Sequence, residues 1–226
     1  MNPPIGRPFP RFIADSPQER PAYGRWEERL REEFARACEP HQAEAGAPLA
    51  PETVKWFPER GWGGRVYVPA TGRAAEPVSS GESREGEEAS GGVLVEYFGW
   101  VSFERPGDGE PAELRAKADF TDVTAADNPD WKIDLSDDVI GAWRAEGDRG
   151  GDITLVWGLP LVRGAVAATA ELDGEVLDQT AVQDGRFTLV AVDAVRGFGD
   201  DLYLEVKLWD RTLRQIAAES LYDEPE

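Results

Sequence analysis

The side chains that carry most enzyme chemistry are scarce in this chain of 226 residues. It holds one cysteine, Cys38, and one histidine, His41, with Pro40 between them. A nucleophilic Cys–His pair needs both groups side by side, and Pro40 interrupts the helix turn that would place them so. A zinc site or a His-ligated catalytic metal needs more such ligands than the chain has. We therefore predict no catalytic residues, with Cys38 packed as a small apolar group and His41 in solvent.

Carboxylates, in contrast, are plentiful, and they gather in one stretch. The chain has 44 acidic and 24 basic residues, which gives a formal net charge of −20. The densest run holds Asp122, Asp127, Asp130, Asp134, Asp137 and Asp138. Calcium binds converging carboxylate oxygens at about 2.4 Å, so Asp127, Asp130 and Asp134 are candidate Ca²⁺ ligands, and we expect no other cofactor. The spacing does not match an EF-hand, and the competing interpretation is that these aspartates only cap turns of a loop at 124–138.

Tryptophans offer a second kind of binding chemistry, because an exposed indole ring can stack on a sugar. Of the eight tryptophans, four lie near predicted turns or strand ends and are candidates for ligand stacking: Trp62, Trp131, Trp157 and Trp209. The alternative is that these rings fill the core, as tryptophan in a small β protein more often does.

The N-terminal part predicts one amphipathic helix after a proline-rich arm. Trp26, Leu30 and Phe34 recur every four residues among charged neighbours, and Pro40 ends the pattern. This apolar stripe is expected to pack on the body of the protein. The alternative is that Trp26, Leu30 and Phe34 are interaction residues that contact another chain.

Beyond the arm, the hydrophobic pattern changes to the period of two that is typical of strands. Residues 112–120 alternate strictly between apolar and charged side chains, and Asp173-Gly174 and Asp184-Gly185 have the form of two-residue hairpin turns. The predicted strands are residues 93–104, 112–120, 139–146, 153–158, 165–172, 175–182, 186–193, 202–210 and 213–222.

Nine short strands joined mostly by tight turns indicate a mainly β protein. We predict an antiparallel β-sandwich, with a closed up-and-down barrel as the alternative, and a short N-terminal helical arm. Residues 72–92 are rich in Gly, Ser and Glu and poor in apolar side chains, so they read as a flexible linker. The expected organisation is an arm at 1–71 with one helix and a short strand, the linker at 72–92, and the β domain at 93–226.

One short motif resembles a known group of barrels. Gly141-Ala142-Trp143, at a predicted strand start, resembles the Gly-x-Trp opening of calycins such as lipocalins. The resemblance implies a barrel that holds a small ligand. Strands are predicted before the motif, whereas calycins place it on their first strand, and no residue roles are carried over.

The charge also narrows the classes of partner. A net charge of −20 repels phosphate backbones and anionic lipid headgroups, so we expect neither nucleic-acid nor membrane binding. No apolar run resembles a signal sequence or a membrane span, and we expect a cytoplasmic protein. The function that fits best is a non-enzymatic protein that works through its surface, either in an assembly with itself or as a partner of another protein. The alternatives are a small-ligand or carbohydrate-binding module and a carboxylate-dependent hydrolase.

Overall fold

The computed structural model describes residues 26–75, 94–104, 110–144, 150–172, 174–192 and 204–221. These residues form two compact units. One unit holds the described residues of 21–56 and 61–129, and the other holds residues 57–60 together with the described residues from Asp130 onward. The strands pair in antiparallel sheets, none of which closes on itself within the described part of the chain. The predicted β-sandwich with a short N-terminal helix is therefore confirmed, and the barrel alternative is wrong.

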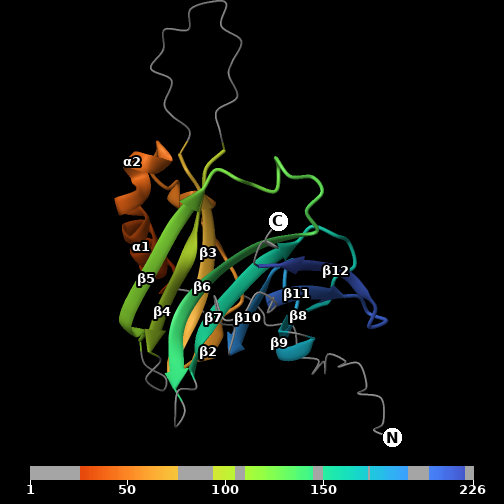
Figure 1. Ribbon diagram of the computed structural model, residues 1–226. Coiled ribbons are helices and arrows are strands. Elements are labelled where there is room, and N and C mark those ends of the chain that lie inside the picture. The colour runs from red at the N-terminus through yellow and green to blue at the C-terminus, as the bar shows by residue number, and fades with distance from the viewer. Residues whose placement is uncertain are drawn as a thin grey trace, which may run out of the picture. The chain divides into compact units, whose positions relative to one another are not determined.

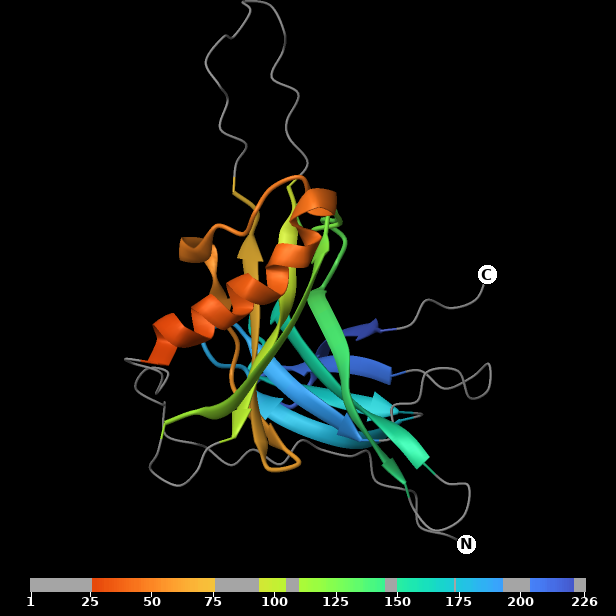
Figure 2. The ribbon, with the colours of Figure 1, turned by 90° about the vertical axis from the view of Figure 1, so that its left-hand side faces the viewer.

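In the first unit a helix covers one sheet (Figures 1 and 2). The helix α1 (Glu27–Cys38) leads into a 3₁₀ turn, the short α2 (Gln42–Ala45) and a second 3₁₀ turn. The strands follow the order β1-β3-β4-β5, with β2 paired to β3. Their bounds are β1 Lys55–Trp56, β2 Arg60–Trp62, β3 Arg65–Arg73, β4 Glu96–Glu104 and β5 Ala112–Thr121.

The predicted apolar stripe forms the contact between the helix and this sheet. Leu30 and Phe34 are fully buried, and they pack in one cluster with Tyr97 and Val101 of β4. Because Leu30 and Phe34 face the chain's own sheet, neither is on the surface. Trp26 directly precedes α1 and is partly exposed, so the interaction role predicted for it stays a prediction.

The predicted linker joins two neighbouring strands of this sheet. Strand β3 pairs with β4 along its whole length, from Arg65 opposite Glu104 to Arg73 opposite Glu96. Residues 76–92 of the linker lie outside the described residues. The two units separate instead near Pro129. The composition of the linker does not mark the boundary between the units, because strand pairing decides which flanking segments belong together.

The second unit is the β-sandwich. One sheet has the order β10-β7-β6 and the other the order β12-β11-β8-β9. Their shared core includes Val156 and Leu189 from the first sheet, with Val206 and Leu208 from the second. The strands are β6 Ile133–Arg144, β7 Gly150–Pro160, β8 Ala167–Leu172, β9 Glu175–Ala181, β10 Phe187–Val192, β11 Leu204–Trp209 and β12 Gln215–Ser220 (Figure 1).

Strand β6 begins earlier than its sequence predicts. Residues 133–138, expected in a loop, pair with β7 in a regular ladder interrupted by one irregularity after Val139. Gly141-Ala142-Trp143 lies within this strand, well after β1 to β5. The calycin-like motif is therefore part of an open sheet.

In the described residues no helix is long and apolar enough to cross a membrane.

Candidate functional site

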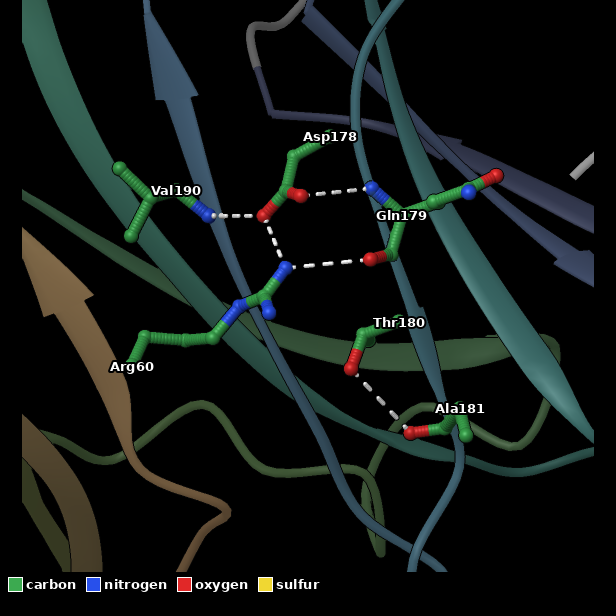
Figure 3. A network of polar contacts seen from close by, with 6 residues as sticks. All are labelled: Arg60, Asp178, Gln179, Thr180, Ala181 and Val190. Carbon is green, nitrogen blue, oxygen red and sulfur yellow. Dashed lines mark hydrogen bonds and ion pairs between the residues drawn. The ribbon is translucent and has the colours of Figure 1, made fainter. Parts of the chain in front are cut away.

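A polar network joins a short connecting segment to two strands of the sandwich (Figure 3). Arg60 donates a hydrogen bond from Nη2 to the Asp178 carboxylate at 2.5 Å and another to the Gln179 carbonyl oxygen at 3.1 Å. Asp178 also accepts the backbone N–H groups of Val190 and Gln179, each at 2.8 Å. The Arg60 and Asp178 side chains are half-buried, so their attraction is screened less than that of a surface pair.

This network lies where the two strands of one hairpin, β9 and β10, separate into different sheets. Asp184 and Gly185 form its turn, both with positive φ (48° and 71°), as a type I′ turn requires. The flanking Gln183 and Arg186 form a two-way backbone bridge, which confirms the predicted hairpin. Beyond the bridge, β9 becomes the edge of one sheet and β10 the edge of the other.

The separation of β9 and β10 leaves backbone groups that a continued ladder would have paired. Counted from the Gln183–Arg186 bridge, Gln179 lies opposite Val190. Instead of bonding to each other, these residues bond to side chains: Asp178 accepts both of their N–H groups, and Arg60 donates to the Gln179 carbonyl. Satisfying such edge groups matters because an unpaired buried backbone group costs about 1–3 kcal/mol.

Arg60 belongs to a segment of four residues, 57–60, that we call the strap. In sequence the strap follows β1, and its last residue, Arg60, is the first residue of β2, but its contacts group it with the sandwich. At its start, Phe57 is 4% exposed, and the Arg186 guanidinium lies 5.9 Å from the centre of its ring. The strap therefore contacts the hairpin at two points, beside the turn through Phe57 and at the separation through Arg60.

A second polar network crosses the neighbouring strands β8 and β11. Lys207 contacts Glu171 at 2.5 Å and Glu205 at 3.0 Å. The other Glu171 oxygen accepts the Thr169 hydroxyl at 3.0 Å, and that hydroxyl accepts the indole N–H of Trp209 at 2.9 Å. We call these residues the Glu171–Lys207 network.

Strand alternation explains how charged groups come together there. Ala168, Ala170 and Val206 point into the sandwich core, so their neighbours Glu171 and Lys207 share the opposite face. Glu171 is nevertheless only 4% exposed. Burial lowers the pKa of Lys207, but hydrogen bonds to Glu171 and Glu205 and the charges of both carboxylates outweigh it, so the pKa lies above its ordinary value.

The cysteine and the histidine lie in different environments. Cys38 is fully buried among the apolar side chains beneath α1. This burial raises the pKa of its thiol from 9.0 to about 12, so at neutral pH the sulfur is protonated. His41 has its Nδ1 3.9 Å from an Asp119 carboxylate oxygen, beyond hydrogen-bonding distance.

The raised thiol pKa predicts alkaline destabilisation of the unit that contains α1. Above pH 9 the unfolded chain loses the Cys38 proton while the folded chain keeps it, so stability falls between pH 9 and about 12. The slope contributed is at most about 1.4 kcal/mol per pH unit. Urea unfolding of the wild type and of Cys38→Ala at several pH values measures it. A wild-type slope no steeper than that of Cys38→Ala would contradict the prediction.

The tryptophans proposed for ligand stacking lie in different environments. Trp157 and Trp209 are 1% and 2% exposed, so their rings have no free face for a sugar. Trp62, on β2, and Trp131, just before β6, are partly exposed. For these two rings the stacking role stays a prediction.

The three aspartates proposed as calcium ligands are also described. Asp127 accepts a hydrogen bond from the Thr124 hydroxyl at 2.9 Å, which is the turn-forming role that competes with metal binding. Asp130 is exposed, and burial in β6 raises the pKa of Asp134. Across the described ranges, no group of three or more His, Cys, Asp or Glu side chains is placed to hold a metal ion.

Sequence patterns did not single out Arg60, Asp178, Glu171 or Lys207. The one sequence signal that could have pointed to these networks was the charge of Glu171 within an alanine-rich strand. Comparison of the chain with protein-family models, curated proteins and solved structures finds no match and so adds no further signal. The partner of Glu171, Lys207, is 36 positions away, and only the pairing of β8 with β11 brings the two together.

Proposed function

We propose that this protein is a non-enzymatic binding protein that acts through its acidic surface on a basic protein partner. The observation that carries the proposal is the excess of carboxylates, 44 acidic against 24 basic residues. The excess occurs in both halves of the chain, because residues 130–226 alone hold 21 acidic and 9 basic residues. Such a surface attracts a positively charged partner and speeds the encounter with it.

The hydrogen bonds and ion pairs that the buried polar groups make support a binding role over a catalytic one. Asp178 and Glu171 each contact a basic side chain, and each also accepts a second hydrogen bond from within the sandwich. Tyr97 donates its hydroxyl to the Ala47 carbonyl at 2.6 Å. These groups are fixed in contacts that hold strands and turns together, whereas a catalytic acid or base must be free to exchange a proton with substrate.

The sign of the charge favours a different protein over a second copy as the partner. Two copies meeting through this surface would bring carboxylates against carboxylates, which is unfavourable. A basic protein instead gains charge complementarity along the whole contact. Binding of this kind weakens with salt, because the screening length falls from about 10 Å at 0.1 M to about 3 Å at 1 M.

Two charge-matched variants test where the partner binds. One variant carries Asp122→Asn, Asp127→Asn and Asp130→Asn in the aspartate-rich stretch, and the other carries three Glu→Gln changes on and beside α1, at Glu28, Glu32 and Glu39. All six side chains are exposed and both variants lose three negative charges. We expect the first variant to bind a partner purified from the native host about tenfold more weakly, and the second to change by less than about threefold.

The same titrations, repeated at two salt concentrations, can contradict the proposed function. Affinity that is equal at 50 and 500 mM NaCl, or equal for the wild type and both variants, would refute an electrostatic surface. The proposal also fails if the wild type captures nothing beyond what an unrelated acidic protein of similar charge captures.

A further inference from the structure

We propose that the strap, residues 57–60, covers the place where β9 and β10 separate into different sheets, which we call the corner of the sandwich. This guard role prevents β9 and β10 from pairing with a strand of a second copy of this chain. This inference concerns the strap alone and does not depend on the proposed acidic binding surface. Exposed sheet edges are templates for pairing with other chains, and proteins cover them or place charges on them.

The geometry at the corner carries the inference. Among the strands that the structure describes, β9 and β10 are both edge strands, and they diverge from one hairpin, so two edges without a neighbouring strand lie at one place. The Gln179 carbonyl on β9 and the Val190 N–H on β10 point away from the ladders of their own sheets, toward Arg60 and Asp178 (Figure 3). An incoming strand would need these same groups, so the strap and such a strand exclude each other.

At the corner, Arg60 contributes a charge and hydrogen bonds in addition to its volume. The Asp178 side chain is 23% exposed, and Arg60 supplies a positive charge beside it as well as a donor for the Gln179 carbonyl. One guanidinium nitrogen, Nη2, makes both contacts, and the rigid planar group holds it in place, whereas a lysine ammonium sits on a flexible stem. Lysine at position 60 should therefore retain the ion pair and hold the Gln179 carbonyl less firmly.

Asp178→Asn and Arg60→Ala test the guard role in the full chain. We expect the Gln179 and Val190 amides to exchange with solvent deuterium about tenfold faster or more in both variants, because their acceptor is weakened or displaced. We also expect mass measured by light scattering to rise with protein concentration in 500 mM NaCl, where repulsion between the acidic copies is screened. Arg60→Lys should show a smaller effect of the same kind.

Matched controls come from an exposed ion pair on α1. Arg36 contacts Glu33 at 2.7 Å, so Arg36→Ala and Glu33→Gln make the same charge changes away from the sandwich, and both should remain monomeric. Faster exchange without association would overturn the guard role, and so would variants that remain monomeric with protected amides. Association accompanied by loss of the β circular dichroism signal would overturn it as well, since that is unfolding and not edge pairing.

Discussion

Replacing Lys207 with methionine lowers the free energy of unfolding of the sandwich by about 3 kcal/mol, which is the scale expected when a buried ion pair loses one partner. The change removes the cation beside Glu171, whose carboxylate is almost completely buried. Methionine fills similar volume, so packing loss is small and the effect reports on the uncompensated charge. Urea unfolding followed by tryptophan fluorescence measures it.

A double-mutant cycle separates charge from packing. Glu171→Met combined with Lys207→Met removes both charges, and the double variant should recover most of the stability lost by Lys207→Met alone. If the stability lost by the double variant equals the sum of the losses of the two single variants, the two residues act independently. The ion pair is then not what stabilises this face.

The same pair gives the sandwich an alkaline limit. Because the folded-state pKa of Lys207 lies above its ordinary value of 10.5, the stabilisation is fully present below pH 10.5 and is lost as pH rises through the folded-state pKa. In Lys207→Met this part of the pH dependence is absent. Unfolding midpoints that fall equally for both proteins above pH 10.5 would contradict the assignment.

Replacing Gly158 with alanine is the second change with a large expected effect, again about 3 kcal/mol or more from steric overlap. Gly158 lies on β7 with no room for a side chain. A Cβ atom there would lie 2.5 Å from the Asp134 carbonyl oxygen and 2.9 Å from both Leu135 Cδ2 and Phe187 Cζ. The backbone oxygen cannot move aside without disturbing the β6–β7 ladder, so thermal unfolding should begin at a markedly lower temperature.

Gly141→Ala provides the control within the same sheet. Gly141 lies on β6, and a Cβ atom there would contact Ile153 at ordinary distances of 3.9 and 4.0 Å. Alanine also restricts the unfolded chain more than glycine does, so this variant should be unchanged or slightly more stable. Equal losses for Gly158→Ala and Gly141→Ala would show that backbone freedom, and not the close approach at Gly158, explains the result.

Local signals in the sequence were sufficient wherever one element is specified by neighbouring residues. The four-residue spacing of Trp26, Leu30 and Phe34 predicted α1, and Leu30 and Phe34 are two of the three side chains that α1 buries. Asp184-Gly185 predicted a hairpin turn, and both residues have the positive φ that the turn needs. The alternation along 112–120 predicted β5, which spans Ala112–Thr121.

Features that depend on distant pairing were not available from those signals. The composition of residues 72–92 indicated a boundary, yet the strands on either side are neighbours in one sheet. Trp157 and Trp209 near strand ends were candidates for an exposed surface, yet both are buried. Period-two patterns say which face a residue shares with its strand neighbours, but they do not say which strand lies beside it or what covers the face.

By itself, the sequence determined the class of the fold, the first helix, the hairpin turn and the strong negative charge, because each depends on residues close together in the chain or on composition alone. The tertiary structure decided that one hairpin would divide between two sheets, that Arg60 would meet Asp178 across 118 positions, and that Lys207 would compensate Glu171. Those contacts follow from the pairing order of the strands, which is set by the burial of whole faces and not by any local pattern.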